Sequence, residues 1–271
     1  MTWAKELEEL RKREELAEQM GGPDKVARQH GRGKMDARAR LDAICDPGSF
    51  REIGKIAGKG HYDENGDLQG VTPAPFLFGK ATVNGRPVVA TADDFTIRGG
   101  AADAGIKRKM VQAEQMAHEL RLPIIKMIDG TGGGGSVKTL EQIGATYIPA
   151  VPGWGDTVKN LDTVPVVALA IGPTAGLGAA RIAASHYSIM VRGLSQLFAA
   201  GPAVVDGLGE AYKSAEDHQQ AKEELGGVDI HTRNGVVDDE VASEAEAFAR
   251  ARYFLSFMPE HVGQHARRCE P

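Results

Sequence analysis

The sequence predicts an α/β fold, and three observations support this prediction. Short apolar runs that are typical of buried strands, such as residues 123–128 and 165–170, alternate with longer periodic segments that are typical of helices. Glycine-rich turns follow several of these runs, as expected where a strand leads into a helix. The chain has 271 residues, of which 42% are hydrophobic and 25% are charged, so it can form one large core or two small ones.

Composition and charge exclude several classes of protein. A net charge of −5 at pH 7 gives no general affinity for nucleic acid. No run of about 18 apolar residues is present, so no membrane span is predicted. Residues 1–19 form a charged, periodic segment rather than a signal peptide. Cys45 and Cys269 match neither a metal-binding pattern nor a disulfide framework, which favours a reducing compartment such as the cytoplasm.

Three helices are predicted in the N-terminal part of the chain. Residues 3–20 form an amphipathic, highly charged helix that ends at the Gly-Gly-Pro segment 21–23. A second helix covers residues 24–30. Asp36 is the predicted N-cap of a third helix, which runs through Ile44.

Basic side chains are concentrated just before and within the third helix. They either form a solvated or salt-bridged face, which is the commoner situation, or bind an anion. These residues are Arg32, Lys34, Arg38 and Arg40.

A hairpin and then alternating strands and helices are predicted after this segment. Residues 57–75 are polar and glycine-rich and are interpreted as a loop. Asn84-Gly85 between two apolar runs predicts a hairpin that pairs residues 78–83 with 87–92. The other predicted elements are helix 104–120, strand 123–128, a helical signal from about Thr139 that Pro149, Pro152 and Gly153 end, strand 165–170, a short helix after Gly176, strand 187–191, an extended segment 195–200, helix 214–225, a turn at 226–235 and helix 239–257.

Glycine-rich turns follow three predicted strands, at residues 99–100, 130–135 and 172–178. Glycine permits a positive φ and lets a ligand approach the backbone closely. The first N–H groups of a helix have no intrahelical acceptor, so they can hold the oxyanion of a thioester enolate. Tight packing is the alternative explanation. The second and third turns are interpreted as two backbone-lined walls of one site.

A nucleotide site explains the middle turn less well. A phosphate loop needs Lys-Ser/Thr directly after its last glycine. Here Gly135 is followed by Ser136 and Val137, and Lys138-Thr139 comes two residues late. No Gly-x-Gly-x-x-Gly with a well-placed acidic residue supports a dinucleotide-binding fold either.

Side chains that could act in catalysis are few. No nucleophile triad and no metal cluster is recognised, so no metal is predicted. His186, His218 and His231 lack ligand spacing and are interpreted as surface or structural residues. Asp93-Asp94 at a strand end are either acid/base groups or turn caps. A site made of backbone donors favours enolate chemistry in which another group supplies the base.

Five segments occur in a fixed order along nearly the whole chain. They are ARQHGRGKMDARARLDAICDPGSFREIG, TADDFTIRGGAADAGIKRKMVQAEQMA, LPIIKMIDGTGGGG, IGPTAGLGAA and KEELGGVDIHTRNGVVDD. In this order they resemble the N-terminal half of the carboxyltransferase β subunit of biotin-dependent acyl-CoA carboxylases, of the propionyl-CoA and methylcrotonoyl-CoA type. The resemblance implies a crotonase-like ββα superhelix. It also implies acyl-CoA binding and carboxyl transfer from carboxybiotin to the α- or vinylogous carbon of the acyl-CoA.

The resemblance further implies roles for individual residues. The backbone N–H groups of Gly176 and Leu177 would hold the enolate oxygen, and Gly133 and Gly134 would line the opposite wall. No side-chain base is assigned, because in the family the biotin enolate left after CO2 release is thought to be the base. The expected substrate-binding residues are Arg98, Gly99, Gly100, Lys107 and Gly132, where Arg98 and Lys107 either contact the CoA phosphates or are ordinary surface charges.

The sequence departs from the family at several points. Gly176-Leu177 stands where the family usually has Gly-Gly, so the leucine side chain could narrow the acyl pocket. Thr131 and four glycines replace a Ser-Gly-Gly-Ala-Arg type of turn. Arg98 stands where the methylcrotonoyl type has lysine, which weakly favours a substrate other than propionyl-CoA. Residues 208–224 look longer than the family's equivalent.

The resemblance also implies domain organisation and partners. Residues 1–23 are expected to be a helical extension and residues 24–271 a crotonase-like domain, and the chain ends at RRCEP where the family continues into a homologous second domain. We therefore expect a second carboxyltransferase half or subunit, a biotin carboxylase and biotin carrier, and a homo- or hetero-oligomer. The expected location is the cytoplasm, or the mitochondrial matrix in a eukaryote. The alternatives are a subunit of a biotin-dependent acyl-CoA decarboxylase and a non-catalytic assembly subunit.

Overall fold

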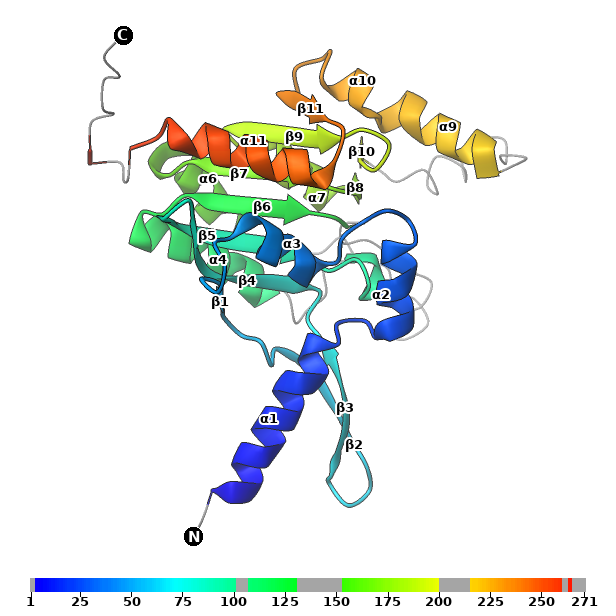
Figure 1. Cartoon of the computed structure of the whole chain (residues 1–271), viewed down its shortest axis with the longest axis vertical. Coiled ribbons are helices and arrows are strands. Elements are labelled where there is room, and N and C mark those ends of the chain that lie inside the picture. The colour runs from blue at the N-terminus through cyan, green and yellow to red at the C-terminus, as the bar shows by residue number, and fades with distance from the viewer. Residues whose placement is uncertain (1–2, 101–106, 131–152, 200–214, 260–262, 265–271) are drawn as a thin grey trace.

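The centre of the molecule is a seven-stranded sheet (Figure 1). The computed structural model describes residues 3–100, 107–130, 153–199, 215–259 and 263–264. The first three strands in the order β1-β4-β5-β6-β7-β9-β11 are antiparallel and the others continue from β5 in parallel. The strands are β1 (Arg51–Glu52), β4 (Phe76–Val83), β5 (Arg86–Asp93), β6 (Ile124–Ile128), β7 (Val166–Ala170), β9 (Tyr187–Val191) and β11 (Asp239–Val241). The predicted α/β class is confirmed.

Helices cover both faces of the sheet (Figure 1). On one face, α3 (Ala37–Ile44) and α11 (Glu244–Ser256) pack with alternate strand residues such as Ala90 and Met127 in one core cluster. On the other face, α4 (Lys107–Leu120) and α6 (Trp154–Thr163) pack against strand residues that include Val89. Because successive side chains of a strand point to opposite faces, continuous apolar runs fill both cores.

The hairpin predicted at Asn84-Gly85 is confirmed. It joins β4 to β5, and Asn84 and Gly85 have φ values of 51° and 77°. Two positive φ values in a two-residue loop match the twist of the flanking strands. The Asp46 carboxylate accepts hydrogen bonds from the N–H groups of Asn84 and Gly85, each at 2.8 Å.

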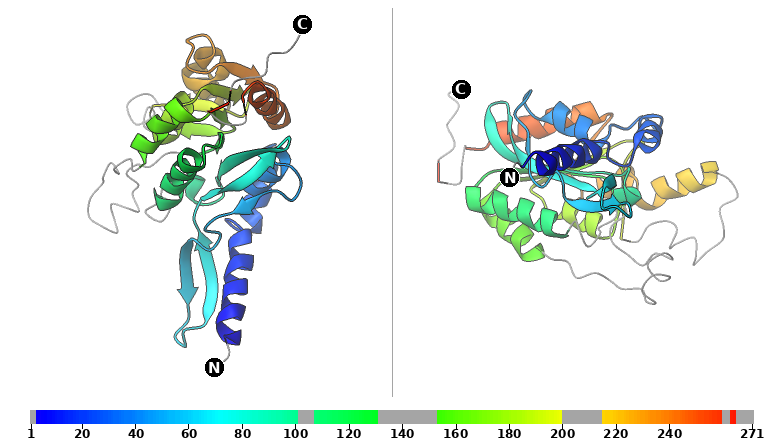
Figure 2. Two further views of the ribbon diagram at one scale, coloured as in Figure 1. Left: turned by 90° about the vertical axis from the view of Figure 1, so that its left-hand side faces the viewer. Right: turned by 90° about the horizontal axis from the view of Figure 1, so that it is seen from below.

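Residues 57–75 do not form the predicted loop. They contain the hairpin of β2 (Gly58–Tyr62) and β3 (Leu68–Pro73), which projects from the body beside α1 (Ala4–Glu18) (Figure 2). The two elements hold each other, because Lys12 Nζ donates to the Leu68 carbonyl and the Tyr62 hydroxyl donates to Glu9. The strands are largely exposed, so they lack the apolar run by which a buried strand is recognised.

The three N-terminal helices agree with the prediction. They are α1, α2 (Pro23–His30) and α3. Asp36 is the N-cap of α3, and its Oδ1 accepts hydrogen bonds from the N–H groups of Arg38 and Ala39, each at 2.9 Å. Burial raises the pKa of the Asp36 carboxyl, but the Ala39 and Arg38 N–H groups and His30 together lower it below its ordinary value.

Replacing Asp36 by alanine should lower the free energy of unfolding by about 1 kcal/mol, because α3 loses its N-cap. Since the folded-state pKa of Asp36 is depressed, its stabilisation should be fully present above the ordinary aspartate pKa and lost as the pH falls through the folded value. Urea titrations of both proteins between neutral and acid pH measure this. Asp36→Asn, which can still cap the helix, is the control. An Asp36→Ala protein with unchanged stability at neutral pH contradicts the assignment.

The C-terminal half differs from the prediction in several details. α6 is a helix that the sequence analysis missed. The turn at 226–235 contains the short helix α10 (Val228–His231), and residues 239–241 are strand β11 rather than the start of the last helix. Ser243 caps α11 by accepting from the Glu246 N–H. The helical signal from Thr139 lies outside the described residues.

The remaining elements surround the last glycine turn. They are β8 (Pro173–Ala175), α7 (Leu177–Ala183), β10 (Gln196–Phe198) and α9 (Ala215–Gly226). β8 and β10 form a small parallel sheet of their own. The extended segment predicted at 195–200 corresponds to β10. In the described part of the chain, no helix is both long and apolar enough to cross a membrane.

Candidate functional site

Three strand ends bring the glycine turns together at the carboxyl edge of the sheet. A Cβ atom on Gly100 would lie 2.4 Å from the Asp129 carbonyl oxygen, so only glycine permits this approach. From the other side, the Ala175 N–H donates to the Gly130 carbonyl at 3.2 Å. The turn after β5 and the turn after β7 therefore both contact the first residue of the turn after β6. Gly132, Gly133 and Gly134 lie outside the described residues.

The backbone conformation at Gly176 starts α7. Gly176 has φ 58° and ψ −117°, a region that residues with a side chain rarely adopt, and α7 begins at the next residue. Its N–H donates to the Phe198 carbonyl at 3.0 Å, so in this conformation it is already engaged. The Leu177 N–H belongs to the first turn of α7, where no intrahelical carbonyl can accept it. Of the two predicted oxyanion donors, Leu177 is the better placed.

The turn after β5, Arg98–Gly100, has positive φ at all three residues, so it is a tight left-handed turn. Arg98 is exposed, and its side chain lines an open cavity between this turn and α2. Lys107 is the first described residue of α4, and the structure describes its backbone but not its side chain. The structure thus places Arg98, Gly99 and Gly100 at the same sheet edge as Gly176.

A buried network of charges lies directly beneath this edge. Arg40, which is 0% exposed, donates from Nη1 to Asp129 at 2.8 Å and from Nε to Glu244 at 2.7 Å. Lys34 Nζ lies 2.6 Å from Asp129 Oδ2, the oxygen that Arg40 also contacts, and 2.8 Å from Oδ1. Burial lowers the pKa of Lys34 and Asp129 opposes this. Arg40 and Lys34 are therefore salt-bridged in the interior rather than on a solvated face.

A second ion pair links α7 to the ends of two strands. Arg181 donates to both oxygens of Asp93 at 3.1 Å, and Asp93 also accepts from the Asp129 N–H at 3.3 Å. Burial raises the pKa of Asp93 and Arg181 opposes this. Asp94 caps the following turn by accepting from the N–H and hydroxyl of Thr96. Both aspartates are thus engaged in holding the turns.

The histidines in the described residues have structural partners. His186 accepts from the Val166 N–H and contacts the Leu161 carbonyl, and His231 contacts the Leu197 carbonyl. No group of three or more metal-ligating side chains occurs in the described residues. His218 belongs to α9, but its side chain lies outside the description.

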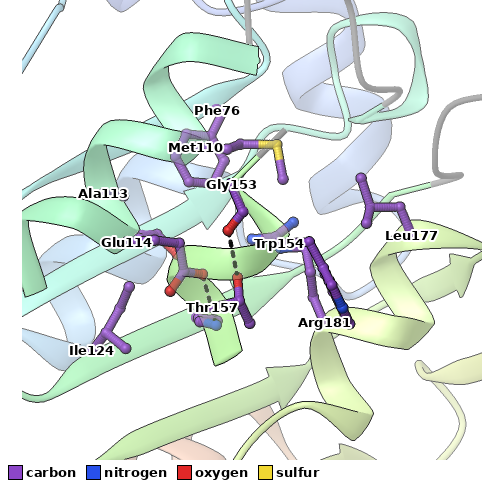
Figure 3. Close-up of a pocket in the computed structure, with 12 residues that line it drawn as sticks. Phe76, Met110, Ala113, Glu114, Ile124, Gly153, Trp154, Thr157, Leu177 and Arg181 are labelled. Carbon is purple, nitrogen blue, oxygen red and sulfur yellow. Dashed lines mark hydrogen bonds and ion pairs between the residues drawn. The ribbon is translucent and has the colours of Figure 1, made fainter. Parts of the chain in front are cut away.

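A small cavity lies next to Leu177, between α4, α6 and α7 (Figure 3). Met110, Trp154, Leu177 and Arg181 line it, and its volume is about 20 Å³. Such a space accommodates about one water molecule. It is therefore too small to be an acyl-chain pocket.

The comparisons with known proteins point to one family. The model of the carboxyl transferase domain matches residues 28–270. The chain is 32% identical over 258 residues to the propionyl-CoA carboxylase beta chain of Roseobacter denitrificans, covering 93% of this chain and 48% of that protein. It is 28% identical over 246 residues to the methylmalonyl-CoA decarboxylase subunit alpha of Veillonella parvula, covering 89% of this chain and 45% of the relative. The chain thus spans about half the length of the curated relatives that it matches.

Solved structures agree with the match to this family. The transcarboxylase 12S hexamer, with methylmalonyl-CoA and methylmalonic acid bound, superposes with a TM-score of 0.79 at 28% identity over 100% of this chain and 51% of that chain. The beta subunit of geranyl-CoA carboxylase from P. aeruginosa has the same fold, with a TM-score of 0.68 at 24% identity over 87% of this chain and 42% of that chain. These likenesses confirm the crotonase-like fold.

Proposed function

Because the chain belongs to the carboxyl transferase domain family, we propose that it is the acyl-CoA-binding half of a biotin-dependent carboxyltransferase. The reaction transfers a carboxyl group from carboxybiotin to the α- or vinylogous carbon of an acyl-CoA. The observation that carries this proposal is the meeting of three glycine turns at one strand edge, where backbone groups can approach a thioester closely. The related transcarboxylase 12S, solved with methylmalonyl-CoA bound, supports the substrate class.

In the proposed site, this chain holds the substrate and stabilises the charge that forms on it. The thioester oxygen becomes an enolate oxygen, and the Leu177 N–H donates to it. The main role proposed for Gly176 is conformational, because its backbone angles allow α7 to begin at the next residue. Its own N–H could donate to the substrate only if its hydrogen bond to the Phe198 carbonyl were broken. Gly133 and Gly134 are proposed to line the opposite wall.

The hydrogen-bond donors proposed for this site are backbone N–H groups, and such a site suits a co-substrate that carries its own reactive group. Near the turns, the buried acids Asp93 and Asp129 are each ion-paired, so neither is a free base. Carboxybiotin, carried by a partner protein, supplies the carboxyl group. The chain's own residues bind and orient the thioester and keep the turns in place.

We propose that Arg98, together with Gly99, Gly100, Gly132 and Lys107, binds the CoA portion. Replacing Arg98 by alanine should raise the KM for acyl-CoA more than it lowers kcat, because a remote phosphate contact is made equally in the ground and transition states. The effect should shrink with added salt, which screens exposed charges. Steady-state kinetics of the assembled enzyme at low and high ionic strength measure this. An unchanged KM at low ionic strength contradicts the role.

The partners follow from the same proposal. A second carboxyltransferase half would supply the biotin wall, and a biotin carboxylase and biotin carrier would deliver carboxybiotin. The assembly is proposed to be oligomeric, as the hexameric transcarboxylase 12S is. Residues 1–23 would form an extension to a domain of residues 24–271, and the complex would act in the cytoplasm, or in the matrix of a mitochondrion.

Carboxyl transfer by the purified chain, alone and with its partners, tests the proposal. The chain alone should bind acyl-CoA weakly and transfer no carboxyl group. Transfer should appear when the second half, a biotinylated carrier and a biotin carboxylase are added together with bicarbonate and ATP. Robust transfer by the chain alone would contradict the proposal that this chain provides only half of the site. Binding of CoA without turnover in the full complex would instead support a non-catalytic assembly subunit, and turnover only towards decarboxylation would support the decarboxylase.

A further inference from the structure

A cavity of about 320 Å³ lies at the amino ends of β6 and β7, on the edge of the sheet opposite to the glycine turns. Pro123 and Pro165 line it just before these two strands begin. The ends of α6 and α11 complete its walls with apolar side chains, which include Leu161, Phe254 and Met258 (Figure 1). Its volume lies in the range of about 300–1,000 Å³ that is usual for small-molecule sites.

Hydrogen bonds hold the walls of this cavity in place before any ligand binds. Two Nη atoms of Arg86 donate to the carbonyls of Met258 and Pro259, at 2.6 and 2.5 Å, and so fix the chain that follows α11. On another wall, the ring of His186 contacts the Leu161 carbonyl at 2.9 Å and ties the end of α6 to the start of β9. The cavity is therefore pre-formed, as ligand sites usually are.

One cation and one anion stand at the rim of this apolar cavity. Arg121 and Asp162 both line it, and both residues are exposed. Among the residues that the structure describes, neither side chain forms an ion pair or a hydrogen bond, with the other or with a third group. His186 also lies at the rim, but both of its ring nitrogens already have backbone partners. A ligand that carries one negative and one positive group can thus be paired at both ends.

We propose that this cavity binds an α-amino acid with a large apolar side chain. The carboxylate of the amino acid pairs with Arg121, its ammonium group pairs with Asp162, and its side chain fills the space between α6 and the end of α11. A fatty acid leaves Asp162 without a partner, and an apolar amine leaves Arg121 without one, whereas the zwitterion matches both charges. The inference is independent of the proposed function, because the cavity lies at the opposite edge of the sheet.

Calorimetric titration of the purified chain with related compounds tests the inference. L-Phenylalanine carries both charges and an apolar ring, whereas 3-phenylpropionate lacks the ammonium group, 2-phenylethylamine lacks the carboxylate and glycine lacks the ring. Phenylalanine should bind most tightly and the two singly charged compounds about 5-fold more weakly, since each loses one exposed ion pair. Glycine should bind most weakly, because it buries no apolar surface. Equal affinities for phenylalanine and either singly charged compound would overturn the inference, as would a lack of binding by both L-phenylalanine and L-leucine.

Substitutions at the rim assign each charge to its partner. Arg121→Gln should weaken phenylalanine binding about 5-fold and leave 2-phenylethylamine binding unchanged, because that amine has no carboxylate to pair. Asp162→Asn should weaken phenylalanine binding to the same extent and leave 3-phenylpropionate binding unchanged. A general loss of binding for all three aromatic compounds in both variants would contradict the pairing.

Arg108→Gln on α4 and Glu64→Gln in the loop between β2 and β3 are the matched controls. Both residues are exposed and lie outside the cavity, so these variants should bind phenylalanine as the wild type does. Equal losses in the rim variants and the controls would overturn the inference. An excess of CoA should not displace phenylalanine, and displacement would show that the amino acid binds at the candidate site instead.

Discussion

Replacing Arg40 by methionine should lower the free energy of unfolding by about 3–5 kcal/mol. Arg40 is buried and bonds to Asp129, Glu244 and the Ile171 carbonyl, so its loss leaves two buried carboxylates without their main partner. Removing one partner of a buried ion pair carries this cost because the remaining charge is not solvated. Urea denaturation followed by circular dichroism measures it.

Arg192 offers a matched control for this prediction. It also pairs with two carboxylates, those of Asp229 and Glu240, but its side chain is 49% exposed. Arg192→Met should therefore cost at most about 1 kcal/mol, since water solvates the charges that remain. Adding Glu244→Gln to Arg40→Met should recover part of the loss, because one unpaired charge is removed. Equal costs for the two arginine variants would contradict a special role for burial.

Replacing Gly176 by valine should lower kcat/KM for carboxyl transfer in the assembled enzyme by about 10²–10³, the usual cost of one lost oxyanion donor. The reason is conformational. At φ 58° and ψ −117° a β-branched residue is strained, so the turn should shift and move the Leu177 N–H. A strained residue of this kind also costs about 1–3 kcal/mol of stability.

The Gly193→Val variant is the control that separates the effect of backbone strain on stability from the effect on the reaction rate. Gly193 also has a positive φ, of 75°, but it lies in the turn after β9 rather than among the three glycine turns. This variant should lose stability by a similar amount and retain its rate once folded. Near-normal turnover by a folded Gly176→Val enzyme would sink the assignment of this turn to the oxyanion.

Local patterns were enough to predict most elements of the sheet and its helices. Asn84-Gly85 predicts the β4–β5 hairpin because both residues tolerate positive φ. Asp36 predicts the start of α3 because its carboxylate replaces missing backbone acceptors. The hairpin β2–β3 and helix α6 were missed. The hairpin is stabilised by α1, far along the chain, and α6 follows a proline- and glycine-containing segment that signals a break.

For the candidate site, too, one part was predictable from the sequence and another part depended on the tertiary structure. The residue types alone showed that glycine turns follow strands, because the freedom of glycine to adopt a positive φ is a property of the residue itself. They also indicated Arg98-Gly99-Gly100 and Gly176-Leu177 as candidate site residues. Only the tertiary structure decided that these turns meet at Gly130 and that Phe198 engages the Gly176 N–H. It also showed that Arg40 and Lys34 are buried against Asp129, while Arg32 lines an open cavity. Whether a charge is solvated or paired depends on residues up to 204 positions away in the sequence, and no local pattern contains them.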